Sequence, residues 1–324
     1  MNTTERYPTD RYDALAIAGP TAVGKTALSI EIAKRLSGEI ISCDSMQIYK
    51  KMDIGTAKAT AEERAEVPHH LIDFLELSCD YSAADYVKDA TLAMKDIASR
   101  GAFPVFCGGT GLYLDSVIRG EYPVEASGDE ALRAELYAIA EAEGNGALHR
   151  MLCELDPLAA QKIHENNVVR VVRAIEIIKT TSMTKTEYDR RTALSEKKNF
   201  FCVYLTFSDR ETLYRRIERR VDMMIEEGLC EELEALLGDG LFLKNKTASA
   251  AIGYKELIPY VRGERSLCDC VEQLKTATRR YAKRQLTWFS HRDYMRPIYC
   301  DDGGRIRTTD EIADEVCRLF SASV

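Results

Sequence analysis

The feature that most constrains the fold is the segment GPTAVGKT, residues 19–26, which separates an apolar run from a helix-like stretch. Residues 15–18 (LAIA) are typical of a strand, and residues 27–36 (ALSIEIAKRL) are typical of a helix. The two glycines of the segment allow backbone N–H groups to converge on one anion, and the N-terminus of the helix adds partial positive charge. The chain therefore carries a phosphate-binding loop at a strand-to-helix turn.

Two side chains add chemistry to this loop. Lys25 brings a full positive charge, and the hydroxyl of Thr26 can bind Mg²⁺. A chance match in an ordinary strand–turn–helix is the alternative. The pattern predicts that phosphate groups bind here. It does not distinguish a nucleotide from any other diphosphate, because both would be bound by the same interactions. We expect the loop residues to surround the phosphate groups: Gly19, Pro20, Thr21, Ala22, Val23, Gly24, Lys25 and Thr26.

Apolar runs and helical patterns alternate along the first third of the chain. The runs cover residues 14–19, 39–44, 69–74 and 103–109, and two more stand at 200–207 and near 300. Such alternation predicts a parallel sheet, whereas residues between about 120 and 198 show only helical patterns. We predict an α/β fold with a P-loop NTPase-like parallel sheet core and an all-helical insertion. The expected domains are 1–118 and 199–324 for the core and 119–198 for the insertion.

Composition and charge exclude several classes of protein. No segment reaches the roughly 18 apolar residues that a membrane helix needs, and the polar start has no signal-peptide core, so we expect a cytoplasmic protein without membrane contact. The net charge of −8 argues against indiscriminate nucleic-acid binding. Residues 275–296 nevertheless hold seven Lys and Arg against one acid, which is either a footprint for a polyanion or a solvated helix face. No coiled-coil heptad is evident, so we expect a monomer.

Polar residues follow three of the predicted strands. Asp44, Asp73 and the turn GGTG at 108–111 each come directly after an apolar run. Because ligands of open parallel sheets bind beyond the carboxyl ends of the strands, we expect these residues to gather round the phosphate-binding loop. Asp44 could hold Mg²⁺, accept a proton or merely cap the next helix. The GGTG turn, with Thr110 as a donor, either approaches a ligand or is a tight turn alone.

Arginines recur at helical spacing in three places. Arg170 and Arg173 share one helix face, and the segment LYRRIERRV at 213–221 repeats that geometry. Clustered guanidinium groups of this kind either bind phosphate oxygens or pair with neighbouring glutamates. Arg280, Arg284 and Trp288 recur every four residues, which suits a phosphate backbone with a base stacked alongside, unless the tryptophan belongs to the core.

Nine segments in order along the chain resemble the tRNA dimethylallyltransferase family, P-loop enzymes that prenylate an adenosine beside the anticodon. The resemblance implies that the loop holds the diphosphate of dimethylallyl diphosphate, and that the partners of the chain are this donor and tRNA. The segments are GPTAVGKT, DSMQIY, IGTAK, HHLID, GGTGLY, IHENNVVRVVRAIE, LYRRIERRVDMM, AIGYKE and RRYAKRQLTWF.

The resemblance also assigns catalytic roles. Asp44 would be the base or hydrogen-bond partner for the N6 amine of the target adenosine, taking the proton as the C–N bond forms. Lys25, Thr110 and Arg220 would stabilise the charge that develops on the leaving diphosphate, together with Mg²⁺ near Thr26, the one implied cofactor.

The target base must leave its stack to reach such a site, so the family implies base flipping and an RNA-binding surface. Two positions depart from the family pattern: Ala59 follows the lysine of GTAK where proline is frequent, and Ala250 precedes AIGYKE where glutamine is frequent. The residues that would bind tRNA are Asp44, Ser45, Met46, Gln47, Thr110, Arg133, Arg170, Arg173, Arg280, Lys283 and Arg284.

Three other functions compete with this interpretation. A P-loop small-molecule kinase would use the same loop but leaves the basic C-terminal stripe unexplained, and steady ATP turnover would favour it. Prenylation of free adenine nucleotides needs no RNA-sized channel. A non-catalytic RNA-binding protein with a relict loop would not need Asp44, Lys25 and Thr26 together.

Overall fold

The computed structural model describes residues 9–120, 128–192 and 198–322. The chain divides into two compact units: a core unit formed by residues 1–117 and 198–324, and a helical unit formed by residues 118–197. Within the described residues, no helix has the length and apolarity needed to cross a membrane.

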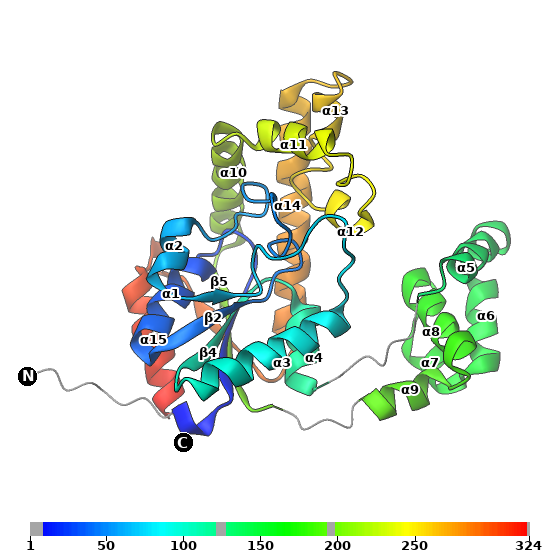
Figure 1. Cartoon of the computed structure of the whole chain (residues 1–324), viewed down its shortest axis with the longest axis horizontal. Coiled ribbons are helices and arrows are strands. Elements are labelled where there is room, and N and C mark those ends of the chain that lie inside the picture. Colours follow the sequence, from blue (N-terminus) through cyan, green and yellow to red (C-terminus); the bar gives the residue numbers. More distant parts are fainter. Residues whose placement is uncertain (1–8, 121–127, 193–197, 323–324) are drawn as a thin grey trace, which may run out of the picture. The chain divides into compact units, whose positions relative to one another are not determined.

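The core unit is built on a six-stranded sheet in which all pairings are parallel, with strand order β3-β2-β4-β1-β5-β6. This confirms the predicted α/β fold (Figure 1). After the insertion the chain re-enters the sheet beside its first strand, where Ala14 faces Phe200 and Ala18 faces Tyr204. The strands are β1 Ala14–Ala18, β2 Gly38–Ser42, β3 His69–His70, β4 Phe103–Gly108, β5 Phe200–Thr206 and β6 Met295–Tyr299.

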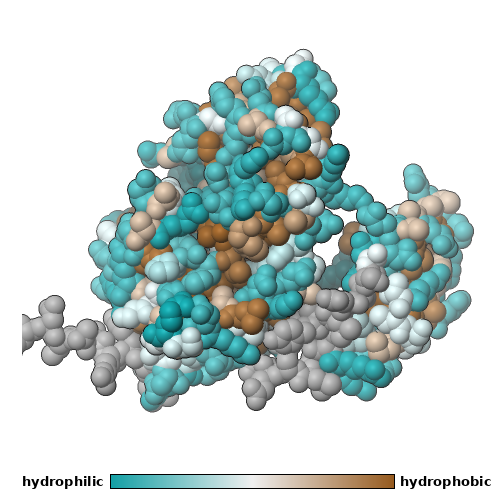
Figure 2. All heavy atoms as spheres, in the orientation of Figure 1, coloured by the Kyte–Doolittle hydropathy of each residue, from teal (hydrophilic) through white to brown (hydrophobic). Residues whose placement is uncertain are grey.

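Helices cover this sheet because its central strands are apolar along their whole length. Every residue of β1 is buried. Helix α1 (Lys25–Leu36) packs against β1, β4 and α15 (Thr309–Ala322), and their shared cluster includes Ile17, Leu28 and Phe320. Helix α3 (Ala83–Ser99) packs against β2 and β4, and α4 (Gly111–Arg119) follows β4. Hydrophilic side chains cover most of the visible face of this unit (Figure 2).

The core unit continues beyond the sheet as a group of helices with its own apolar cluster, which includes Tyr49, Phe242 and Tyr254. Helix α14 (Leu267–Ser290) packs along α10 (Arg210–Glu226) and carries five of the seven Lys and Arg of residues 275–296 (Figure 1). The remaining elements of the unit are η1 Thr9–Arg11, α2 Ala61–Glu66, α10 Arg210–Glu226, α11 Leu229–Gly238, α12 Lys246–Ser249, α13 Ile258–Val261, α14 Leu267–Ser290, β7 Asp301–Asp302 and β8 Arg305–Ile306.

The helical unit contains only helices among its described residues, as predicted. Its apolar cluster joins four of these helices through Leu136, Leu152, Ala159 and Ile175. The helices are α5 Glu130–Glu143, α6 Asn145–Leu155, α7 Pro157–Lys162, α8 Val168–Thr181 and α9 Lys185–Thr192.

Candidate active site

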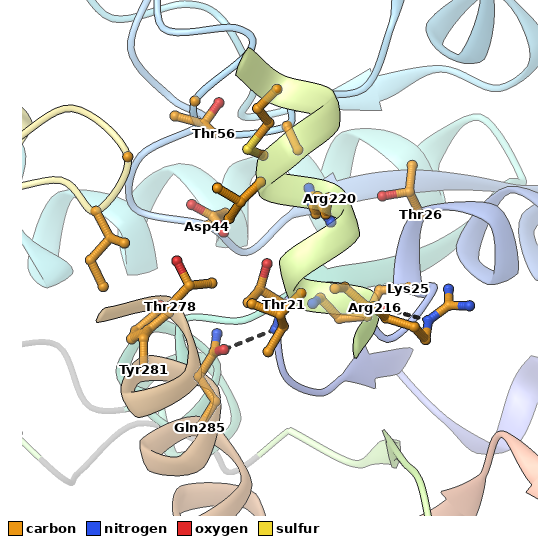
Figure 3. A pocket seen from close by; sticks show the side chains of 18 of the residues that line it. Thr21, Lys25, Thr26, Asp44, Thr56, Arg216, Arg220, Thr278, Tyr281 and Gln285 are labelled. Atoms are coloured by element: carbon orange, nitrogen blue, oxygen red, sulfur yellow. Dashed lines mark hydrogen bonds between the residues drawn. The ribbon is translucent and has the colours of Figure 1, made fainter. Parts of the chain in front are cut away.

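A cavity of about 1000 Å³ lies at the carboxyl ends of β1, β2 and β4. Its walls are the phosphate-binding loop, the segment after β2, helix α10 and helix α14, all of the core unit (Figure 3). The sequence-predicted residues that line it are Thr21, Ala22, Gly24, Lys25, Thr26, Asp44, Ser45, Met46, Gln47, Arg220 and Arg284.

The phosphate-binding loop is held in shape from both neighbouring helices. Ala22 has a positive φ of 63°, and its carbonyl oxygen accepts a hydrogen bond from Nε of Arg216 on α10 at 2.9 Å. From α14, Oε1 of Gln285 accepts the N–H of Thr21 at 3.0 Å. Gly19, with φ of 143°, lies so close to β5 that a Cβ there would stand 2.9 Å from the Leu205 carbonyl oxygen. Gly19, Pro20 and Val23 therefore shape the loop from outside the cavity.

Lys25 is the cation at the centre of the loop. Its Nζ donates to the Pro20 carbonyl oxygen at 2.7 Å. The pKa of Lys25 is lowered to about 8, chiefly by burial and also by the charge of Arg220, whereas Cys107 and Asp44 oppose the shift. An anion placed in the loop would favour the charged form of this ammonium group.

Binding of a diphosphate at this loop should therefore depend on pH. Below pH 8 Lys25 is charged and attracts a diphosphate, and above its pKa of about 8 it becomes neutral. We expect the affinity for an organic diphosphate, measured by calorimetry, to fall by up to about tenfold per pH unit above that value. Lys25→Arg is the matched variant, because its charge persists, and its affinity should stay flat to pH 9.5. An equal fall in both proteins would refute the assignment.

Arg220 is the second cation of the cavity. It is half-buried and has no ion-pair partner among the described residues. The neighbouring Glu218, a candidate partner for the α10 arginines, instead accepts from Nη1 of Arg279 at 2.5 Å. Arg220 is therefore available for an anionic ligand, as its predicted role requires.

Asp44 divides its two carboxylate oxygens between structure and cavity. Oδ1 accepts the N–H groups of Met46 at 2.9 Å and Gln47 at 3.4 Å, so the carboxylate does cap a turn. Oδ2 has no hydrogen-bond partner among the residues that the structure describes. One oxygen is thus held by the backbone, and the other can accept a proton.

Thr110 lies behind this segment. Its Oγ1 accepts the N–H of Ser45 at 3.0 Å and faces Oγ of Ser45 at 3.3 Å. Gln47 is fixed in the same way, since its Nε2 donates to the carbonyl oxygens of Thr56 and Ala57, both at 3.1 Å. Thr110 is absent from the cavity lining, so in this structure its hydroxyl positions the segment that carries Asp44.

The expectation that Asp73 belongs to the site is wrong. Its carboxylate accepts from Nζ of Lys58 at 2.8 Å and from Arg64 at 3.1 Å, and it does not line the cavity. Lys58 is a buried ammonium that also bonds the Tyr49 carbonyl oxygen at 2.7 Å. A buried charge must be paired, and Asp73 pairs it together with Asp53, whose Oδ1 lies 2.6 Å from the same Nζ.

The predicted RNA-binding residues of α14 all lie on its exposed surface. Arg280, Lys283 and Arg284 are exposed, and the Arg284 guanidinium lies 5.6 Å from the centre of the Tyr281 ring. Trp288 is not on this surface: it packs against Gly111, and the guanidinium of Arg292 lies 4.6 Å from its ring centre. This tryptophan therefore packs within the core unit.

In the helical unit, Arg170 is exposed, whereas Arg133 and Arg173 share one buried partner. Glu176 is fully buried; its Oε1 accepts from Nε of Arg133 at 2.7 Å and its Oε2 from Nη1 of Arg173 at 2.6 Å. Burial alone raises the pKa of Glu176, but hydrogen bonds from Arg173, the Asp129 N–H and Arg133 outweigh it and lower the pKa. Arg133 thus joins α5 to α8, whereas Arg173 pairs with Glu176 within α8.

Glu176→Gln should destabilise the chain by about 2 kcal/mol, because two guanidinium groups then face a neutral amide. Since its pKa is lowered on folding, the contribution of Glu176 is present at neutral pH and is lost as the pH falls through the folded-state value. Urea denaturation of the full chain measures the effect. The exposed ion pair of Glu187 with Arg191 offers the control Glu187→Gln, with an expected change below about 0.5 kcal/mol. Equal destabilisation by Glu176→Gln and Glu187→Gln would refute the role of Glu176 as the shared partner of the two arginines.

Three residues of α14 that face the cavity were not among the predicted site residues. Thr278, Tyr281 and Gln285 line the cavity, and their spacing of three and four residues is that of one helix face. The same spacing is visible in the sequence and could have found them. Of the two departures from the family pattern, Ala59 is buried and Ala250 lines the cavity.

The fold and the site together define a P-loop α/β protein with a large cavity at the phosphate-binding loop. The chain matches the family described as IPP transferase over residues 47–292 and that described as isopentenyl transferase over residues 12–78. It is 49% identical over 276 residues to the tRNA dimethylallyltransferase of Bacillus velezensis, covering 85% of this chain and 87% of that one. It is 41% identical over 310 residues to that of Caldanaerobacter subterraneus, covering 95% and 97%.

Solved structures agree with these relatives. The tRNA isopentenylpyrophosphate transferase of Bacillus halodurans superposes with a TM-score of 0.68 at 43% identity, covering 94% of each chain. A eukaryotic dimethylallyltransferase, described as acting on tRNA, gives 0.71 at 32% identity, covering 85% of this chain and 69% of that one. The chain belongs to the tRNA dimethylallyltransferase family.

Proposed function

We propose that this enzyme transfers the dimethylallyl group of dimethylallyl diphosphate to N6 of the adenosine beside the anticodon of tRNA. The N6 lone pair attacks C1 of the allylic donor, the C1–O bond breaks, and diphosphate leaves with the bonding electrons. The N6 proton passes to the carboxylate of Asp44. One observation carries the proposal: Asp44, with one uncommitted oxygen, lines the same cavity as the phosphate-binding loop.

The phosphate-binding loop and its neighbours would bind and stabilise the leaving diphosphate. Backbone N–H groups at the start of α1, the Lys25 ammonium and the Arg220 guanidinium face the cavity, where they would oppose the charge that develops on the leaving group. These donors are preorganised, because Arg216 and Gln285 already hold the loop. Stabilisation of the departing diphosphate is therefore assigned to Lys25 and Arg220.

The residues present fit a Mg²⁺ ion that is held mainly by the substrate. Thr26 lines the cavity, and its hydroxyl has no hydrogen-bond partner among the described residues. Mg²⁺ usually keeps several waters and takes few protein ligands when it binds phosphates, which a single hydroxyl satisfies. When bound, the ion would neutralise charge on the diphosphate oxygens.

The acceptor must enter as an extruded base. A cavity of about 1000 Å³ can hold an adenine together with a five-carbon diphosphate. Ser45, Met46 and Gln47 would line the entrance beside Asp44, and Tyr281 offers an aromatic face. Arg280, Lys283 and Arg284 on the core unit and Arg170 on the helical unit would bind the RNA backbone. We propose that a monomer does this in the cytoplasm, where tRNA is found.

Competition between acceptors tests the function. With radiolabelled dimethylallyl diphosphate and Mg²⁺, unmodified tRNA should take up label, and a thousandfold excess of AMP should leave that uptake unchanged. Preferred labelling of AMP would replace the proposal with prenylation of free adenine nucleotides. Steady ATP hydrolysis without label transfer would favour the kinase.

A further inference from the structure

Gln285 is a buried amide at the base of the cavity, and it joins two loops that are far apart in sequence. Its side chain lies between the phosphate-binding loop and the glycine-rich turn that follows β4. Oε1 accepts the N–H of Thr21 at 3.0 Å, and Nε2 donates to the carbonyl oxygen of Gly109 at 2.9 Å. Figure 3 shows Gln285 reaching from α14 to Thr21. The amide suits this bridge because one of its ends accepts a hydrogen bond and the other donates one.

The surroundings are fitted to this amide. A Cβ at position 109 would stand 2.2 Å from Nε2 of Gln285, so only glycine allows the two groups to meet. Gln285 is 6% exposed, and at that burial a lost partner leaves a polar group unsatisfied. The bridge is therefore a buried contact that depends on glutamine at position 285 and glycine at position 109.

The series of hydrogen bonds continues from Gln285 to the segment that carries Asp44, the proposed proton acceptor. Gly109 is followed by Thr110, whose Oγ1 accepts the N–H of Ser45, the residue next to Asp44. Hydrogen bonds thus run from the loop at Thr21 through Gln285 and the glycine-rich turn to the segment of Asp44. Each end of this series carries one half of the proposed reaction: the diphosphate at one end and the proton acceptor at the other.

We infer that Gln285 is a positioning residue for prenyl transfer, which sets the phosphate-binding loop and Asp44 at a fixed separation. It does not touch the reacting atoms; it acts through Thr21 and Gly109. The inference rests on the proposed function. A displacement of about 1 Å in such a site can slow a reaction by about a hundredfold, whereas binding of the separate substrates changes little.

Gln285→Met tests this with a side chain of similar size that makes neither bond. We expect the single-turnover rate of transfer to tRNA to fall by about 30-fold or more, and the affinity for inorganic diphosphate to change less than about threefold. The matched control is Gln273→Met, an exposed glutamine on the same helix, which should retain the wild-type rate. A rate for Gln285→Met within threefold of wild type would overturn the inference, as would a loss explained wholly by weaker diphosphate binding.

Gln285→Glu provides a test that unfolding cannot mimic. Ionised, the new carboxylate keeps the bond to Thr21 but faces the Gly109 carbonyl oxygen without a proton; protonated, it restores both bonds. Burial favours the protonated form. The rate relative to wild type should therefore rise by about tenfold when the pH falls from 8.5 to 6, reversibly. Lys25, Asp44, Tyr281 and Arg284 also line this cavity, so each rate is divided by that of wild type at the same pH.

A flat ratio would overturn the inference. Loss of transfer by the wild-type enzyme itself would instead refute the proposed function, and diphosphate binding, which needs no transfer, keeps the two failures apart.

Discussion

Asp44→Asn is expected to slow prenyl transfer to tRNA by about 10²–10⁴-fold, the usual contribution of a positioned general base. The amide oxygen of asparagine can still accept the N–H groups of Met46 and Gln47, so the turn is preserved. Only the oxygen that takes the proton is replaced, by an N–H₂ group that cannot accept one. Single-turnover measurements with excess enzyme report the chemical step directly.

The control for this variant is Asp80→Asn, an exposed aspartate outside the cavity, which should react at the wild-type rate. Diphosphate affinity should be unchanged in both variants. If Asp44→Asn transfers the prenyl group within threefold of wild type, Asp44 only caps its turn and another group takes the proton.

Lys25→Met is expected to lower the transfer rate by about 10²–10³-fold, the typical loss when one donor to a developing anion is removed. It should also weaken diphosphate binding at pH 7.5, because in our proposal the ammonium contacts the anion before and during the reaction. The two variants thus separate: Lys25→Met affects donor affinity and rate together, and Asp44→Asn affects the rate alone.

Lys34→Met is the matched control, since Lys34 lies on the same helix but pairs with Glu66 in an exposed position. It should bind diphosphate and react as wild type does. Undiminished diphosphate affinity in Lys25→Met would place the diphosphate elsewhere in the cavity and contradict the assignment of the loop.

Patterns that depend on neighbouring residues predicted the fold well. The apolar runs gave the strands, and the loop with Asp44 at a strand end gave the centre of the candidate site, because parallel strands bring their carboxyl ends together. The helical spacing of residues 120–198 gave the insertion. Each of these signals is local along the chain.

Side-chain partners that are distant in sequence could not be predicted in this way. The resemblance placed Arg133 at the tRNA, yet it pairs with the buried Glu176 43 residues away, whereas pairing of Arg173 with a neighbouring glutamate was one of its two expected roles. Asp73 follows a strand as Asp44 does, but its carboxylate pairs with the buried ammonium of Lys58 and does not line the cavity. The bridge of Gln285 spans 264 residues to Thr21, and only the packed fold reveals it.

The most direct test of the proposed function is the mass of the modified nucleoside. The purified enzyme is incubated with dimethylallyl diphosphate, Mg²⁺ and unmodified tRNA, and the tRNA is then digested to nucleosides. We expect a five-carbon gain on the adenosine beside the anticodon, lost or greatly slowed in Asp44→Asn. Absence of that gain in every adenosine-containing tRNA, together with ATP hydrolysis, would contradict it.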